Sequence, residues 1–281
     1  MDTMDAAALY DRISLPVLTI QAAALVLLIT LPAAAVLGFL SGAMRRKMLL
    51  AAGRDVDHVV GETTLGAILA LLGLLLAFSF GNALNVSQAR KSAIVGEGAA
   101  LGTAFLRADY LPEPGRTTLQ QALLDYGQTR FLPGDGSIHT IEQAQAFIAR
   151  TLEAQAKLWP LTLEVTADPL PAPLKTFIAG AMNDAIDAHL YRVETLSNPV
   201  SDITMSMMLA SALMSLFLLG NRAGMVGRKL TWRTFVFSAF LFVVMISILD
   251  TQRGTEGLVR MDDTALRVTV FEMEMALASR N

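Results

Sequence analysis

The stretch TTLGAILALLGLLLAFSFGNALNVSQA, which extends from Thr63 to Ala89, contains no charged residue. A helix needs about 20 mainly apolar residues to cross the roughly 30 Å of hydrocarbon in a bilayer. This stretch is long enough, and charged residues bound it, with Glu62 before it and the pair Arg90-Lys91 after it. The sequence therefore predicts a membrane-spanning helix over 63–89.

Three further uncharged runs predict three more spans. The first covers 13–44 and contains Pro32, where we expect the helix to tilt or kink; the third and fourth cover 203–221 and 234–249. The segment before the first run is acidic, which favours a membrane span there over a cleavable signal peptide. Trp232 precedes the fourth run, which is the shortest, and is typical of an interfacial anchor. Short basic loops join the spans in pairs, so we expect two helical hairpins.

The composition favours lipid as the main partner. Apolar residues make up 53% of the chain and charged residues 17%, whereas soluble domains have about 25% charged residues. The formal net charge of -3, with no basic stripe, argues against nucleic acid as a partner. The chain has no cysteine, which excludes disulfides and thiolate metal sites.

The segment between the hairpins, residues 90–202, is polar enough for water and is divided by clusters of proline and glycine. One part of it, from Thr140 to about Trp159, has apolar residues at helical spacing, and Ser137 or Thr140 can cap it. The apolar positions of that helix are Ile141, Ala144, Phe147, Ile148, Leu152 and Ala156. No strand pattern competes, so we predict an all-α membrane protein with four transmembrane helices and a helical water-exposed domain between the two hairpins.

The C-terminal segment, residues 250–281, predicts an amphipathic helix. Its apolar positions are Leu258, Met261, Leu266, Val270, Met273 and Leu277. Such a helix can lie on the membrane surface or pack on the central domain.

Sequence signals for an enzyme are missing. The three histidines, His58, His139 and His189, are isolated, and there is no phosphate-binding loop or zinc motif. The glycines of the run 96–102 have the wrong spacing for a dinucleotide fingerprint, so we expect them to let helices pack closely. We therefore predict no catalytic residue, no metal site and no cofactor.

The second span has three distinct faces when it is wound at about 100° per residue. Small residues form one stripe, a seam that favours close helix contact: Gly66, Ala70, Gly73, Ala77 and Gly81. A second face begins apolar and becomes polar towards the end of the span: Leu71, Leu75, Phe78, Asn82 and Asn85. The third sector, with Leu69, Leu72, Leu76 and Phe80, is suited to lipid.

The second face has two interpretations. Asn82 and Asn85 can bond across the bundle or lie at the membrane boundary. Alternatively, the face lines a pore in which Leu71, Leu75 and Phe78 form an apolar constriction that opens into a polar mouth. No charged residue lies inside a span, which argues against a proton relay or a voltage sensor and is compatible with a passive conduit.

Several sequence motifs are similar to those of one known family. They are GLLLAFSF at 73–80 followed by Asn82, LGTAFLR at 101–107, LPEP at 111–114, and the single residues Arg90, Tyr126 and Arg130. With these motifs the chain resembles the bestrophin-like family of bacterial membrane proteins, and the layout of hairpin, domain and hairpin covers nearly the whole chain. The resemblance implies a homo-oligomeric ion channel in the bacterial inner membrane, with the second span lining the pore and Leu71, Leu75 and Phe78 as the neck.

The chain also departs from that family. Ser79 occupies the position where bestrophins carry an arginine, and no acidic cluster matches the calcium site of the animal members. The short basic loops favour an external central domain by the charge rule, whereas bestrophins hold this domain inside the cell.

Two functions remain open from the sequence. The first is a homo-oligomeric ion channel with an inorganic ion as the permeating species. The second is a non-conducting membrane sensor or scaffold whose central domain binds a partner or ligand.

Overall fold

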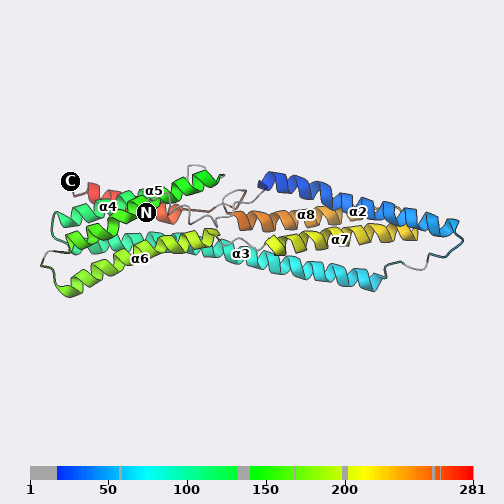
Figure 1. The fold of residues 1–281 in the computed structure, drawn as a ribbon, viewed down its shortest axis with the longest axis horizontal. Coiled ribbons are helices and arrows are strands. Elements are labelled where there is room, and N and C mark those ends of the chain that lie inside the picture. Colours follow the sequence, from blue (N-terminus) through cyan, green and yellow to red (C-terminus); the bar gives the residue numbers. More distant parts are fainter. Residues whose placement is uncertain are drawn as a thin grey trace. The chain divides into compact units, whose positions relative to one another are not determined.

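The computed structural model describes residues 18–56, 59–131, 140–167, 169–197, 202–254, 257–259 and 261–280. Every regular element among these residues is helical (Figure 1), which confirms the predicted all-α class. The described residues form two compact units. The bundle unit contains residues 18–85 and 202–253, and the helical domain contains residues 86–197 and 254–280. Positions 13–17, His58, Ser137 and His139 lie outside the described residues.

Four helices are long and apolar enough to cross a membrane, as the sequence predicts. They are α2 (Ile20–Ala51), α3 (Glu62–Arg107), α7 (Asp202–Val226) and α8 (Trp232–Arg253). Helix α2 begins at Thr19, whose hydroxyl oxygen accepts a hydrogen bond from the Ala22 amide at 3.3 Å. Pro32 lies inside α2, and the helix continues past it.

Helices α2 and α7 approach each other closely through paired glycines. Each helix carries two glycines four residues apart, Gly38 and Gly42 in α2 and Gly220 and Gly224 in α7. A Cβ atom at any of the four positions would collide with the facing backbone, for example with the Phe217 carbonyl opposite Gly38. This is the glycine spacing that lets transmembrane helices pack backbone to backbone. This glycine spacing is present in the sequence of the first and third spans, whereas the seam predicted from the sequence lies on the second span.

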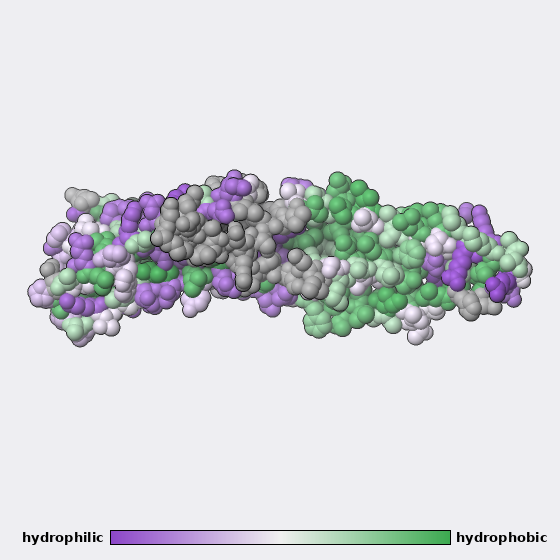
Figure 2. Space-filling view, in the orientation of Figure 1, coloured by the Kyte–Doolittle hydropathy of each residue, from purple (hydrophilic) through white to green (hydrophobic). Residues whose placement is uncertain are grey.

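The core of the bundle unit takes side chains from all four helices. They include Leu27, Leu31, Ala35, Leu72, Leu76, Ala83, Met208, Ala212, Leu216, Leu241, Met245 and Ile248. Leu72 and Leu76 are therefore buried against the other helices, and the prediction that their sector of α3 faces lipid is wrong for these two residues. Outside this core, a largely hydrophobic surface covers the part of the molecule that contains α7 and α8 (Figure 2).

The second span does not end where its uncharged run ends. Helix α3 continues from Ala89 to Arg107 and contributes its second half to the helical domain. The other helices of this domain are η1 (Ala108–Tyr110), α4 (Gly115–Thr129), α5 (Ile141–Val165), α6 (Ala172–Ser197) and α9 (Thr264–Ala278).

Helix α5 confirms the helix predicted from Thr140 and is longer than expected. The Thr140 hydroxyl oxygen accepts a hydrogen bond from the Gln143 amide at 3.2 Å, so this residue is the cap. Of the predicted apolar face, Ala144, Phe147 and Ile148 are buried, and Leu152 packs on them. Ala156 is exposed, because the second half of α5 faces the core through Leu158 instead.

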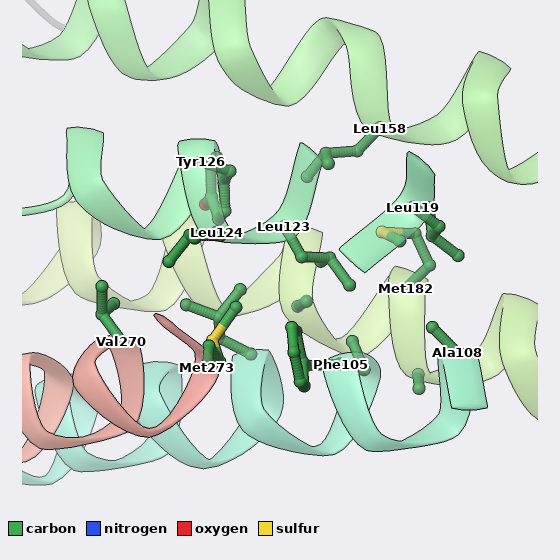
Figure 3. Packing of buried hydrophobic residues seen from close by; sticks show 14 of the residues in the cluster. Phe105, Ala108, Leu119, Leu123, Leu124, Tyr126, Leu158, Met182, Val270 and Met273 are labelled. Atoms are coloured by element: carbon green, nitrogen blue, oxygen red, sulfur yellow. The ribbon is translucent and has the colours of Figure 1, made fainter. Parts of the chain in front are cut away.

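The core of the helical domain includes side chains of α9, the last helix in the sequence. Leu266, Val270 and Met273 are buried among residues of α3, α4, α5 and α6 (Figure 3). The predicted amphipathic helix of the C-terminal segment therefore packs on the domain, and Leu258, which precedes it, is exposed. Of the glycines in the run 96–102, Gly98 and Gly102 lie against Thr269 of α9, as expected for close packing, whereas a Cβ atom at Gly96 would meet nothing within 4 Å.

Candidate functional site: the exposed face of helix α3

The five residues of the predicted pore-lining face lie on the part of α3 that belongs to the bundle unit. Leu71 and Phe78 are 66% and 69% exposed, and Asn82 and Asn85 are also exposed. Leu75 is half-buried, because one side of it packs against the bundle core. The packing of a single chain thus leaves this face open for a partner, for water or for lipid.

The hydrogen bonding of Asn82 and Asn85 limits which of these surroundings are possible. Neither Asn82 nor Asn85 makes a side-chain hydrogen bond to any described residue, although both lie within the uncharged run of α3. A carboxamide without a hydrogen-bond partner is costly in hydrocarbon. The interpretation in which these side chains bond across the helices of one chain therefore has no support in the described residues. Water, either in a pore or at the membrane boundary, and a second copy of the chain are left as sources of partners.

The predicted seam of small residues is open as well. A Cβ atom added at Gly66, Gly73 or Gly81 would meet nothing within 4 Å, and Ala70 and Ala77 are exposed. Within the described chain no helix occupies this seam. Its use as a contact between helices therefore remains a prediction.

The residues that anchor α3 occupy the third sector of the helix, about 120° from each of these two faces. Leu65, Leu72, Leu76 and Ala83 are buried and recur at intervals of four and seven residues. This spacing keeps them on one side of a helix. The bundle therefore fixes the rotation of α3 about its own axis, and this rotation decides which residues are offered to a partner.

A second group of residues, in the helical domain, was not identified from the sequence. The Glu97 carboxylate of α3 accepts hydrogen bonds from Arg130, at the end of α4, and from Arg192 of α6, the latter at 2.6 Å. Arg130 also donates to the Thr151 hydroxyl of α5 at 3.1 Å. All of these side chains are almost completely buried. We call Glu97, Arg130 and Arg192 the buried ion cluster.

Two buried neighbours of the ion cluster, Tyr126 and His189, have shifted pKa values. Burial raises the pKa of the Tyr126 hydroxyl, and its oxygen has no hydrogen-bond partner among the described residues. Burial also lowers the pKa of His189 to about 4, and the positive charge of Arg130 contributes in the same direction. Both side chains are therefore uncharged at neutral pH. The cluster ties α3, α4, α5 and α6 together, which indicates a structural role.

The sequence motifs contain one member of the buried ion cluster. Arg130 lies among the residues that carry the family resemblance, but no local pattern pairs it with Glu97, which is 33 positions earlier in the chain. Sequence reasoning treated Glu97 only as part of the glycine-rich run. The pairing depends on how the helices pack, which a helical wheel does not show.

Comparisons with known proteins identify the fold. No family model matches the chain, and no curated protein matches it by sequence. Among solved structures, the chain is similar to a point variant of a bacterial bestrophin homologue from Klebsiella pneumoniae, with a TM-score of 0.65 and 11% identity. That alignment covers 90% of this chain and 99% of the other.

A second solved structure, described as a membrane protein variant, aligns with a TM-score of 0.62 and 11% identity over 89% of this chain and 96% of the other. The likeness extends over both units and nearly the full length of the neighbours. This chain therefore has the bestrophin fold, as the sequence motifs predict.

Proposed function

We propose that this chain, as a membrane protein with the bestrophin fold, assembles into a ring of identical copies and conducts ions through a pore lined by α3. Leu71, Leu75 and Phe78 form the apolar constriction, and Asn82 and Asn85 form the polar mouth. The bacterial origin of the structural neighbour supports the inner membrane of a bacterial cell as its location.

The main support for this proposal is that Asn82 and Asn85 have no hydrogen-bond partner among the described side chains. Two carboxamides point away from their own bundle, within an uncharged run, and no described side chain satisfies them. A water-filled pore supplies the missing partners at no cost in burial. The apolar residues one and two turns earlier on the same face would then exclude water when the pore closes, since narrow hydrophobic constrictions gate by dewetting.

The seam of small residues supports assembly. Gly66, Gly73 and Gly81 present an open groove that an adjacent helix can approach closely. The seam and the proposed pore face lie about 120° apart on α3. A neighbouring copy can therefore occupy the seam while the pore face stays uncovered.

Ion flux tests the proposal most directly. We would purify the protein, measure its mass with bound detergent subtracted, reconstitute it in liposomes and record ion flux. Phe78→Ala should change conductance or leak, because it removes the largest side chain of the constriction. Phe80→Ala is the matched control, since it makes the same substitution about 200° further around the helix.

The two outcomes lead to different functions. Flux from a ring of copies that changes in Phe78→Ala and is unchanged in Phe80→Ala supports a channel with this neck. A folded monomer or dimer that passes no ion would reject the channel and favour a sensor or scaffold. Equal flux in both variants and the parent would reject the neck assignment alone.

A further inference from the structure

The helical domain contains a cavity of about 310 Å³ beside the first charged residues after the second span. Three groups of residues line it: Ser87, Gln88, Arg90, Lys91 and Ile94 of α3, Gly254 directly after α8, and Val259, Met261 and Asp262 before α9. The α3 residues and Gly254 lie within five positions of a predicted membrane boundary in the sequence, and Val259, Met261 and Asp262 follow in the segment that leads to α9. We propose that this cavity binds a phosphodiester group, such as the headgroup of a membrane phospholipid.

The cavity is much larger than a single small ion, with a volume of about 310 Å³. Small-molecule sites begin at about 300 Å³. The space therefore suits a headgroup with its ester carbons, and the apolar side chains of Ile94, Val259 and Met261 offer those carbons a contact.

One cation of the cavity, the Arg90 guanidinium, is held in place by the surrounding helices. Arg90 is only 6% exposed, and its Nε donates a hydrogen bond to the Thr195 carbonyl at 3.2 Å, which fixes the direction of the guanidinium. Gly254 has a φ of 54°, and a Cβ there would come within 2.9 Å of Arg90 Nη1. The guanidinium thus lies against a glycine that leaves it space. Arginine held in this way is a strong donor to phosphate oxygens.

Lys91 and Asp262 determine how much negative charge the cavity accepts. Lys91 is exposed and supplies a second cation. Asp262 is ionised at neutral pH, because hydrogen bonds from the Thr264 hydroxyl and amide lower its pKa. The described lining residues thus include two cations and one carboxylate. A phosphodiester carries a negative charge that these cations can bind.

The polar side chains of Ser87 and Gln88 complete the donor set. Both belong to the last turn before Arg90, on the side of the helix that faces the cavity. A hydroxyl and a carboxamide can donate to the ester or phosphate oxygens once the charge is in place. The site thus combines charge, hydrogen-bond donors and apolar contact, which is the pattern of a headgroup pocket. It does not depend on conduction, so its test is independent of the channel proposal.

Binding can be measured on the full-length protein in detergent. The probes are a short-chain, water-soluble phosphatidylglycerol and, separately, inorganic phosphate, with affinity read from the rise in unfolding temperature. We expect the phospholipid to bind the parent protein about tenfold more tightly than Lys91→Gln, which is the size of one charge-assisted contact. Lys157→Gln is the control, because this lysine is exposed on α5 and does not line the cavity.

A second variant tests the charge argument without touching a cation. Asp262→Asn removes one negative charge from the lining, so the phospholipid and inorganic phosphate should both bind it more tightly than they bind the parent. Inorganic phosphate that reproduces the full effect with the same dependence on Lys91 would overturn the phosphodiester assignment and identify free phosphate as the ligand. Equal phospholipid binding by the parent, Lys91→Gln and Lys157→Gln would overturn the proposal.

Discussion

Glu97 accepts hydrogen bonds from two buried arginines, and its position shows how one carboxylate can hold several helices. Arg130 and Arg192 come from α4 and α6, while Glu97 lies on α3. Taking such charges out of water is expensive, and the cost is offset only while the pairing is complete. Loss of the carboxylate would leave two buried cations without a counter-charge.

We therefore predict that Glu97→Gln destabilises the helical domain by about 3–5 kcal/mol. Thermal or denaturant unfolding of the purified protein measures this. Glu153→Gln is the control, because Glu153 is exposed and pairs with Lys157 at 3.5 Å, and surface pairs contribute less than about 1 kcal/mol. Similar losses in the two variants would contradict the structural role of the buried ion cluster.

His189 predicts a pH dependence of stability. Its pKa is about 4 in the folded protein and about 6.5 when unfolded, so the unfolded state binds more protons between these two values. Stability should therefore be complete above pH 6.5 and fall as the pH drops towards 4, by up to about 3 kcal/mol. Replacement by an uncharged residue, His189→Gln, should flatten the unfolding free energy over this window. An unchanged slope in the variant would show that other groups cause the loss.

For single helices, the sequence pattern predicted where the spans lie but not which neighbour each helix face contacts. The uncharged runs predicted four spans. The helical wheel divided the residues of α3 among three faces. It could not say which face meets the rest of the chain. Leu72 and Leu76 looked suited to lipid but pack in the bundle core, because lipid and a neighbouring helix are equally apolar.

The same limit applies to the helix contacts predicted from glycines. Small residues mark a face that permits close approach, but the sequence does not show which helix packs against that face. In the described chain the close approach is between α2 and α7, at Gly38, Gly42, Gly220 and Gly224. The seam of α3 has the same composition and meets open space. The candidate pore face likewise stays a prediction, since a single chain does not show what covers it.

A pair of variants separates the two kinds of glycine. In Gly42→Ala the new Cβ would collide with the Asn221 carbonyl, so we expect a loss of about 1–3 kcal/mol in the stability of the chain itself. In Gly73→Ala nothing lies within 4 Å, so the single chain should keep its stability. Size-exclusion mass measurements then test assembly, which Gly73→Ala should weaken. A Gly73→Ala protein that unfolds as easily as Gly42→Ala would contradict the described packing.

Each of the two units is built from segments that are far apart in the sequence. The helical domain joins residues 86–197 to residues 254–280, and the second hairpin lies between them. Both pieces must be on the same side of the membrane to share a core. The intervening chain must therefore cross the membrane an even number of times. This supports α8 as a full span, although its uncharged run is the shortest of the four.

The dependence of the domain on α9 can be tested with two substitutions on the same helix. Leu266 is fully buried and Val268 is 49% exposed. Leu266→Asp should destabilise the domain by more than about 3 kcal/mol, because it removes core contacts and buries a charge. Val268→Asp should have little effect. Hydrogen exchange of α4 provides the measurement, and equal protection of α4 in the two variants would show that α9 is not needed for the core.

The late position of α9 in the chain also bears on biosynthesis. The ribosome makes α3, α4, α5 and α6 first, then the second hairpin, and only afterwards the helix that supplies Leu266, Val270 and Met273. Until then the apolar side of the growing domain has no cover and is prone to aggregation. Insertion of α7 and α8 into the bilayer is thus a step that must finish before this domain can mature. A delay in insertion would therefore lengthen the time for which the domain needs protection by chaperones.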